Sequence, residues 1–292
     1  MKQEFNKGLL LTSLGSFWWG FIGVIYFKYV SFIGHTELVV HRCLWTAIML
    51  ILTSTLFSKW KIFFVTIKCK KNLIALFISG FLIFINWAIW IYAVATERII
   101  DASFGYFIMP IISVLLGYIF FKEKLNQKRI FSILLVIISI LFLIFFSLRS
   151  LPWVGLIVAF SWAFYNLVRK KINVDTDIGL LIESLYIFPF AVIVFYLITK
   201  NGMNDFGFSN LRLSLFLILA GPMTVIPLFL YVRGVELIGL GPTGMIFYIT
   251  PTLQFILGYF HYNEEFSLIK FLSFILIWIA VIIYLKDLYE TN

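Results

Sequence analysis

The sequence is poor in charge, cysteine and histidine. Only 13% of its 292 residues are charged and 62% are apolar, whereas about 25% of the residues of a soluble domain are charged. This composition excludes a soluble enzyme. The 2 cysteines and 3 histidines are scattered, and neither a phosphate-binding loop nor a nucleophile beside a base is visible. We therefore expect no enzyme, no cofactor and no metal.

What the chain does contain is long apolar runs, and its mean hydropathy is +1.02. A bilayer-spanning helix needs about 20 apolar residues. Because backbone polar groups must be paired in lipid, and the runs are too uniformly apolar for barrel strands, the prediction is an all-α membrane protein with ten transmembrane helices. Short polar joints, such as 58–72 and 169–177, connect the runs. The runs start near Gly8, Leu38, Leu73, Ala102, Ile130, Leu151, Ile178, Leu213, Gly239 and Leu268.

Lysine and arginine are unequally divided between the two sides of this topology. The side that carries the N-terminus holds 16 of the 23 basic residues, the other side holds 6, and Arg42 lies within a span. Basic residues concentrate in cytoplasmic loops, so both termini are predicted to be cytoplasmic. The net charge of +9 is then explained by orientation in the lipid bilayer, and no nucleic-acid partner is expected.

The second half of the sequence repeats a pattern of residues found in the first. A shift of 141 residues places Pro110 on Pro251 and Glu123 on Glu264. We infer two halves, 1–149 and 150–292, each with five spans. Because five is odd, the second half must enter the membrane inverted, an arrangement typical of secondary carriers. Proline removes a helical hydrogen bond, so Pro110 and Pro251 are predicted hinges.

Ionisable residues near the start of the second span form the first candidate site. Glu37, His41 and Trp45 are four residues apart and share a helix face, with Arg42 about 100° to one side. A charge in the bilayer is costly, so Arg42 should face protein or water. Two interpretations stay open. Arg42 snorkels outward or pairs with Glu37 to hold the fold, or it binds an anionic group with His41 tuning the site or carrying a proton.

Glu183, alone in the seventh span, is the second candidate. It is either a structural acid or a site for substrate or a proton. The repeat places Arg42 and Glu183 at depths that differ by about 13 Å, so no direct ion pair is expected. Our hypothesis is that the two groups bracket the pathway and either meet a zwitterionic substrate or titrate in opposite states.

Polar and aromatic residues elsewhere in the spans predict a lined cavity. Interfacial aromatic belts and hydrogen bonds between helices are the alternative explanations. With His41, Arg42 and Glu183, the predicted substrate-binding residues are Asn86, Trp87, Trp90, Tyr106 and Tyr248.

Several stretches resemble a known family. Ten spans in two inverted halves resemble the drug/metabolite transporter superfamily, EamA type. More closely, 41–45 (HRCLW), 102–107 (ASFGYF), 181–183 (LIE) and 277–280 (IWIA) are similar to its RarD branch, often labelled chloramphenicol-sensitivity proteins. The resemblance implies a permease of the bacterial inner membrane for small metabolites or drugs. It also implies helices one to four and six to nine around a central cavity, with helices five and ten peripheral.

The function predicted is therefore a secondary active or facilitative transporter that works by alternating access, with amino acids or related organic ions as cargo. The alternative is a non-transporting membrane assembly or sensor protein, which would have a packed interior without a cavity. The partners are a small-molecule substrate and the bilayer. Proton coupling and a homodimer are both compatible with the sequence, which decides neither.

Overall fold

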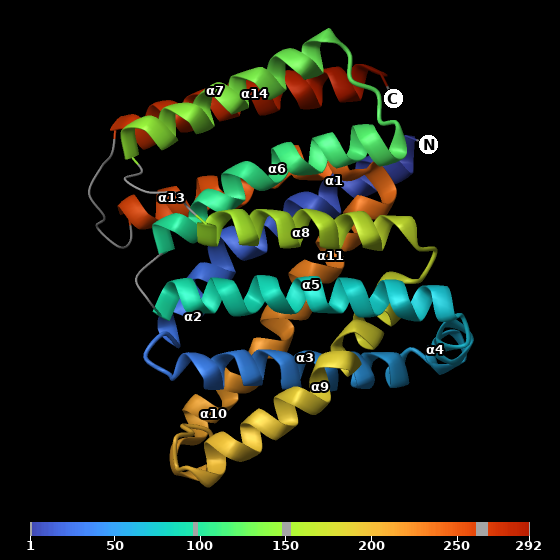
Figure 1. Ribbon diagram of the computed structural model, residues 1–292, viewed down its shortest axis with the longest axis vertical. Helices are drawn as coiled ribbons and strands as arrows, with labels where there is room; N and C mark the ends of the chain where they lie inside the picture. Colours follow the sequence, from blue (N-terminus) through green and yellow to red (C-terminus); the bar gives the residue numbers. More distant parts are fainter. Residues whose placement is uncertain (1, 96–98, 148–152, 261–267, 292) are drawn as a thin grey trace.

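The computed structural model describes residues 2–95, 99–147, 153–260 and 268–291, and all regular structure within these ranges is helical (Figure 1). Seven of the helical segments described are long and apolar enough to span a membrane. Glu264 lies outside the described residues. The elements are α1 (Lys2–Phe17), η1 (Trp18–Gly23), α2 (Val24–Tyr29), α3 (His35–Leu56), α4 (Trp60–Ile67), α5 (Lys70–Ala95), α6 (Ile99–Phe121), α7 (Gln127–Ser147), α8 (Trp153–Lys171), α9 (Thr176–Lys200), η2 (Phe208–Asn210), α10 (Leu211–Ile218), α11 (Ala220–Ile238), α12 (Leu240–Ile246), α13 (Ile249–Phe260) and α14 (Leu268–Thr291).

Three of the predicted spans are interrupted. The first consists of α1, the π-helical turn η1 and α2, the eighth of α10 and α11, and the ninth of α12 and α13. Pro251 is the third residue of α13, where a missing N–H leaves no helical bond unmade. Pro110 lies inside α6 and deprives the carbonyl of Tyr106 of its helical donor. The two candidate hinges thus occupy different positions within their helices.

One predicted joint contains a helix of its own. Segment 58–72, expected to be a polar loop, folds into α4. Phe63 and Ile67 of α4 pack against a core cluster that includes Leu76 and Ile178, whereas Phe64 and Val65 are exposed. An apolar short helix with one buried and one open face is typical of the membrane interface. At eight residues, α4 is far shorter than a membrane span, so the length of its apolar run gives no sign of it in the sequence.

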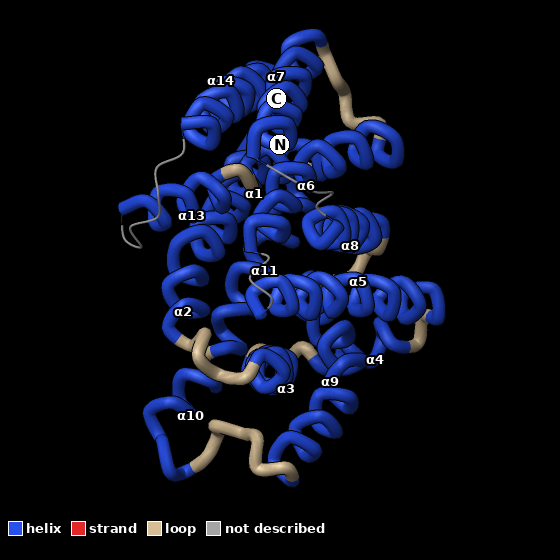
Figure 2. The backbone as a smooth tube through the Cα atoms, turned by 60° about the vertical axis from the view of Figure 1, so that its left-hand side comes forward, coloured by secondary structure: helices blue, strands red, loops and turns tan. Residues whose placement is uncertain are grey.

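Helices from the two halves pack in pairs. α1 packs against α11, α5 against α8, α3 against α9 and α6 against both α8 and α12. α7 and α14 lie against each other at the upper edge of Figure 1, and Figure 2 shows the same pair from another direction. Both chain ends and α4 lie at the same end of the helix bundle (Figure 1).

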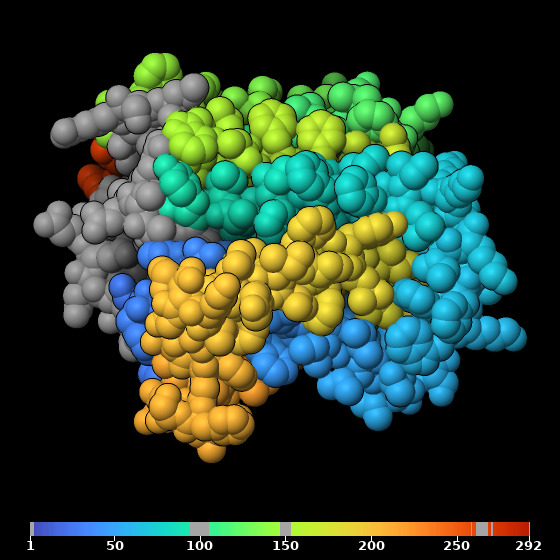
Figure 3. All heavy atoms as spheres, turned by 60° about the horizontal axis from the view of Figure 1, so that its bottom comes forward, coloured from blue at the N-terminus to red at the C-terminus, as the bar shows by residue number. Residues whose placement is uncertain are grey.

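Much of the outer surface is apolar. Phe145, Ile282 and Leu52 are among the many large apolar side chains that are more than half exposed. Figure 3 shows one such face, on which α5 lies between α8 and α9. Such a surface would be unstable in water and suits the hydrocarbon of a bilayer. The fold is therefore that of a multi-pass membrane protein.

Candidate functional site

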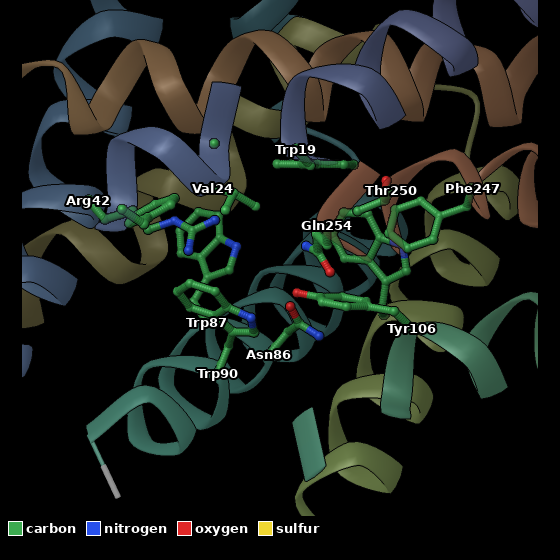
Figure 4. Close-up of a pocket in the computed structure, with 13 residues that line it drawn as sticks. Trp19, Val24, Arg42, Asn86, Trp87, Trp90, Tyr106, Phe247, Thr250 and Gln254 are labelled. Carbon is green, nitrogen blue, oxygen red and sulfur yellow. The ribbon is translucent and has the colours of Figure 1, made fainter. Parts of the chain in front are cut away.

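A cavity of about 70 Å³ lies between the helices, toward the end of the bundle opposite the chain termini. This volume holds several water molecules. Its walls come from both halves of the chain, since η1, α2, α3, α5 and α6 line it together with α8 and α13. Figure 4 shows the lining side chains. The lining residues are Trp19, Gly23, Val24, Phe27, Arg42, Asn86, Trp87, Trp90, Tyr106, Trp162, Phe247, Thr250 and Gln254.

Arg42 is a buried cation on one wall of this cavity. Its Nε donates to Thr224 Oγ1 at 3.0 Å, and its guanidinium carbon lies 4.6 Å from the ring centroid of Trp87 and 5.2 Å from that of Phe27. Within the described residues no carboxylate lies within 4 Å of it. Arg42 has five N–H donors, and one of them binds Thr224 of α11. The rings of Trp87 and Phe27 lie against the guanidinium group and help to fix its position.

Aromatic rings form the opposite wall. Trp19 meets Trp162 edge to face at 5.1 Å, and Phe247 lies 6.1 Å from Trp19 and 5.7 Å from Tyr106. Edge-to-face and tilted contacts of this kind fix the rings without a polar partner. Figure 4 shows Tyr106 and Phe247 on the side of the cavity away from Arg42. An apolar wall of rings set at steep angles to one another therefore faces the guanidinium.

Neutral amides stand between these two walls. Asn86 Nδ2 donates to the carbonyl of Val158 and to Ser161 Oγ, which links α5 to α8. Figure 4 shows the Gln254 amide and the Tyr106 hydroxyl pointing into the cavity. Such groups can orient a polar ligand without contributing charge.

The other predicted residues of the second span face away from the cavity. Glu37 accepts hydrogen bonds from the backbone N–H groups of Asp205 and Phe206, and its Oε1 lies 3.4 Å from His41 Nε2. Trp45 Nε1 donates to His41 Nδ1. This row therefore holds the segment that joins α9 to α10. Arg42 does not pair with Glu37, and His41 does not line the cavity.

Tyr248 is also outside the cavity. It lies between α12 and α13, and its hydroxyl donates to the carbonyl of Phe107 in α6 at 2.8 Å. The side chain is 2% exposed. It ties the fourth and ninth spans together beside Pro110. Of the eight residues predicted to bind substrate, five line the cavity, namely Arg42, Asn86, Trp87, Trp90 and Tyr106.

Glu183 lies in a separate buried network. Ser79 Oγ donates to its Oε1 at 2.5 Å, Tyr165 donates to its Oε2 at 3.2 Å, and Arg169 Nε lies 3.6 Å from Oε1. Glu183 does not line the cavity that holds Arg42. It borders a much smaller void of about 10 Å³ beside Trp87 and Thr46, enough for about one water molecule.

Arg169 is the residue of this network that sequence analysis missed. It was counted with the polar joint 169–177, but it lies in the last turn of α8 and is 1% exposed. Its Nη2 donates to the carbonyl of Thr176, whereas Nε and Nη1 have no hydrogen-bond partner within the described residues. One signal was available, because Tyr165 and Arg169 are four residues apart and so share a helix face.

Polar contacts close the end of the bundle that carries the chain termini. The carboxylate of Glu123 accepts hydrogen bonds from the N–H groups of Leu240 and Gly241, the first two residues of α12. Lys170 donates to the carbonyl of Val235, and Glu236 accepts a hydrogen bond from the Thr176 hydroxyl. Glu123 thus does more than mark the end of a span, because it caps a helix of the other half.

The described residues contain no group of three His, Cys, Asp or Glu side chains that could hold a metal ion. The arrangement instead offers a cavity in the membrane with one cation, several aromatic rings and neutral amides. Together with the all-helical, multi-pass fold, this defines a membrane transporter.

The family follows from comparison with known proteins. The profile of the EamA-like transporter family matches residues 6–145 and 150–286, and the chain belongs to this family. Protein RarD of Escherichia coli (strain K12) is 32% identical over 290 residues, covering 99% of this chain and 97% of that protein. The uncharacterized transporter YojE of Bacillus subtilis (strain 168) is 32% identical over 96% of this chain and 94% of its own. These relatives place the chain in the RarD-like branch.

A solved crystal structure supports the same fold. It superposes with a TM-score of 0.72 over 95% of this chain and 96% of the other, at 12% sequence identity. At this identity the match concerns the fold alone.

Proposed function

We propose that the protein moves small organic solutes across the bacterial inner membrane by alternating access, with amino acids, related organic ions or drugs as the cargo. The observation that carries this proposal is the cavity lined by Arg42, in which a buried cation has no acidic partner among the described residues. A purely structural arginine in a membrane is normally neutralised by a carboxylate or by backbone carbonyls. Here the lining leaves room for a ligand to do so.

Alternating access is supported by the difference between the two ends of the bundle. The cavity occupies the end opposite the chain termini. The other end is closed by polar contacts, including the partly buried ones of Glu123 with α12 and the buried one of Arg169 with Thr176. Polar contacts are suitable for such a closure because they can be exchanged for water when this end opens.

The inverted-repeat arrangement supports the same mechanism. The family profile matches each half of the chain separately. The helix pairs also suit a two-fold axis in the membrane plane, since α1 on α11 corresponds to α8 on α5, and α3 on α9, α6 on α12 and α7 on α14 each join equivalent spans. We propose ten spans as two inverted five-helix repeats, 1–149 and 150–292, rocking about Pro110 and Pro251.

Orientation and coupling complete the proposal. Both termini are placed in the cytoplasm, so the cavity faces the outer side in this conformation. Glu183 is the group proposed to take up a proton, because it is buried beside a void that holds about one water molecule and borders Trp87, a residue of the cavity wall.

Transport is tested with purified protein in vesicles loaded with a panel of labelled metabolites, with and without a pH gradient. We expect uptake or release of at least one compound above that of protein-free vesicles, and its loss in Arg42→Gln. Arg212→Gln is the matched control, because Arg212 is exposed at the same end of the bundle and lies outside the cavity. Vesicles that carry no compound faster than the protein-free ones would contradict transport.

Access is tested with Val24→Cys, at a residue that lines the cavity, in a Cys69→Ser background whose remaining thiol, Cys43, is buried. A membrane-impermeant thiol reagent added outside should modify the introduced thiol, and the cargo should slow the reaction. The Cys69→Ser protein without the introduced thiol is the control and should stay unmodified. Equal modification with and without every transported compound would contradict a substrate site in this cavity.

A further inference from the structure

The cavity carries a single kind of charge. Among its thirteen lining residues Arg42 alone is ionised, and the others are apolar, aromatic or neutral and polar. The two acids expected nearby are engaged elsewhere, Glu37 by the amides of Asp205 and Phe206 and Glu183 by Ser79 and Tyr165. Within the described residues, the cavity therefore has no acid that could bind a positively charged group.

The guanidinium is oriented for a carboxylate. Its Nε is held by Thr224, whose hydroxyl itself donates to the carbonyl of Ala220, and its faces are covered by Phe27 and Trp87. The Nη1 and Nη2 groups remain for a ligand, and two parallel N–H groups match the two oxygens of a carboxylate. Because the side chain is 7% exposed, its charge is screened less than it would be in bulk water.

The rest of the cavity is lined for an uncharged, apolar body. The ring of Phe247 lies across the cavity from Arg42 and contacts the rings of Trp19 and Trp162, and the amide of Gln254 points into the space between. Rings bury apolar surface and an amide binds a neutral substituent. An ammonium group in the same space would meet the positive charge of Arg42.

We infer that the cavity selects a small organic monoanion, a carboxylate on an apolar body without a cationic group, over zwitterions, neutral compounds and amines. This inference rests on the proposed function in taking the cavity as the cargo site. It narrows the proposed cargo to organic anions and excludes both amino acids and the zwitterion expected from sequence, because Glu183 does not reach the cavity.

Binding to the purified protein in lipid nanodiscs tests this inference by calorimetry. The probes share one body and differ in charge: phenylacetate, phenylalanine, phenylacetamide and phenethylamine, with inorganic phosphate as an anion that lacks the body. Phenylacetate should bind at least about tenfold more tightly than any of the others, since hydrogen bonds to a charged group are about twice as strong as neutral ones. Tighter binding of the zwitterion, the amine or phosphate would overturn the inference.

Variants locate the effect. Arg42→Gln should weaken phenylacetate about tenfold or more and leave phenylacetamide within about threefold, whereas Arg42→Lys should keep part of the preference for the acid. Arg212→Gln, at an exposed position outside the cavity, should bind all probes as the parent does. Thermal unfolding of each variant verifies that it is folded. Unchanged binding of phenylacetate to folded Arg42→Gln would overturn the assignment to this cavity.

Vesicle transport of the same probes separates this inference from the proposed function. If phenylacetate binds with the stated preference but no compound crosses the membrane, the charge selectivity of the cavity is supported and the proposed transport function is refuted. If vesicles carry phenethylamine or phenylacetamide as fast as phenylacetate, the proposed transport function is supported and the selection for anions is refuted.

Discussion

Replacing Glu183 by glutamine should destabilise the protein more than replacing its partner Arg169. Glu183→Gln removes the nearer of the two carboxylates that face Arg169, since Glu236 Oε1 lies 3.9 Å from Nη2. Arginine cannot lose its charge in a protein. Breaking a buried ion pair in this way costs about 3–5 kcal/mol. Arg169→Gln instead leaves a carboxyl group that can become neutral by taking up a proton, so its cost should be smaller.

The assay is the apparent unfolding temperature of each purified variant in detergent. Glu183→Gln should lower it on the order of 10 °C, taking a few degrees per kcal/mol as in soluble chains of this size. The variant that combines Glu183→Gln with Arg169→Gln should be at least as stable as Glu183→Gln alone, because it leaves no unpaired charge. Glu290→Gln is the matched control, since Glu290 forms an exposed ion pair with Lys128, worth at most about 1 kcal/mol. If Arg169→Gln lowered the unfolding temperature more than Glu183→Gln does, this reasoning would be refuted.

Three further predictions concern positions outside the cavity. Gly105→Ala should destabilise the protein by about 1–3 kcal/mol, because its Cβ would meet the carbonyl of Gly155 where α6 crosses α8; thermal unfolding measures this. Glu123→Ala should cost about 1–3 kcal/mol in the same assay, because the first two N–H groups of α12 lose their acceptor. Lys59 is partly buried, which by itself lowers its pKa, but Asp177 and Asp175 outweigh this and raise the pKa above its usual value. The stabilisation by Lys59 should therefore be fully present below pH 10.5 and be lost as the pH rises through the raised pKa; unfolding of the parent and Lys59→Gln across this range measures it.

Each of these has its own contrary result. Gly105→Ala as stable as the parent would mean that α6 and α8 separate freely at this crossing. Glu123→Gln should retain part of the stability, so equal losses in both Glu123 variants would argue against capping. A constant difference between the parent and Lys59→Gln up to about pH 12 would mean that the charge of Lys59 is not what stabilises this contact.

The resemblance to a transporter family and the multi-pass helical fold could both be predicted from sequence, and so could several residues of the cavity. Arg42, Trp87 and Tyr106 could be predicted because a charged or polar group within an apolar span costs free energy unless it faces a partner or a cavity. Phe27 and Phe247 were missed, since phenylalanine is abundant throughout the chain and carries no polar signal. Arg169 was missed because a basic residue at the end of a span looks like an orientation signal.

By itself, the sequence determined where the chain can cross lipid, because an unbroken apolar run of sufficient length must form a helix whose backbone groups are paired internally. Only the tertiary structure decided what each buried charge meets. Glu183 and Arg42 look alike in sequence, as single charges within spans, yet one contacts Arg169, Ser79 and Tyr165 while the other faces a cavity. Their difference depends on which faces of α3, α5, α8 and α9 turn toward one another, and helix packing sets this through contacts between residues far apart in the chain.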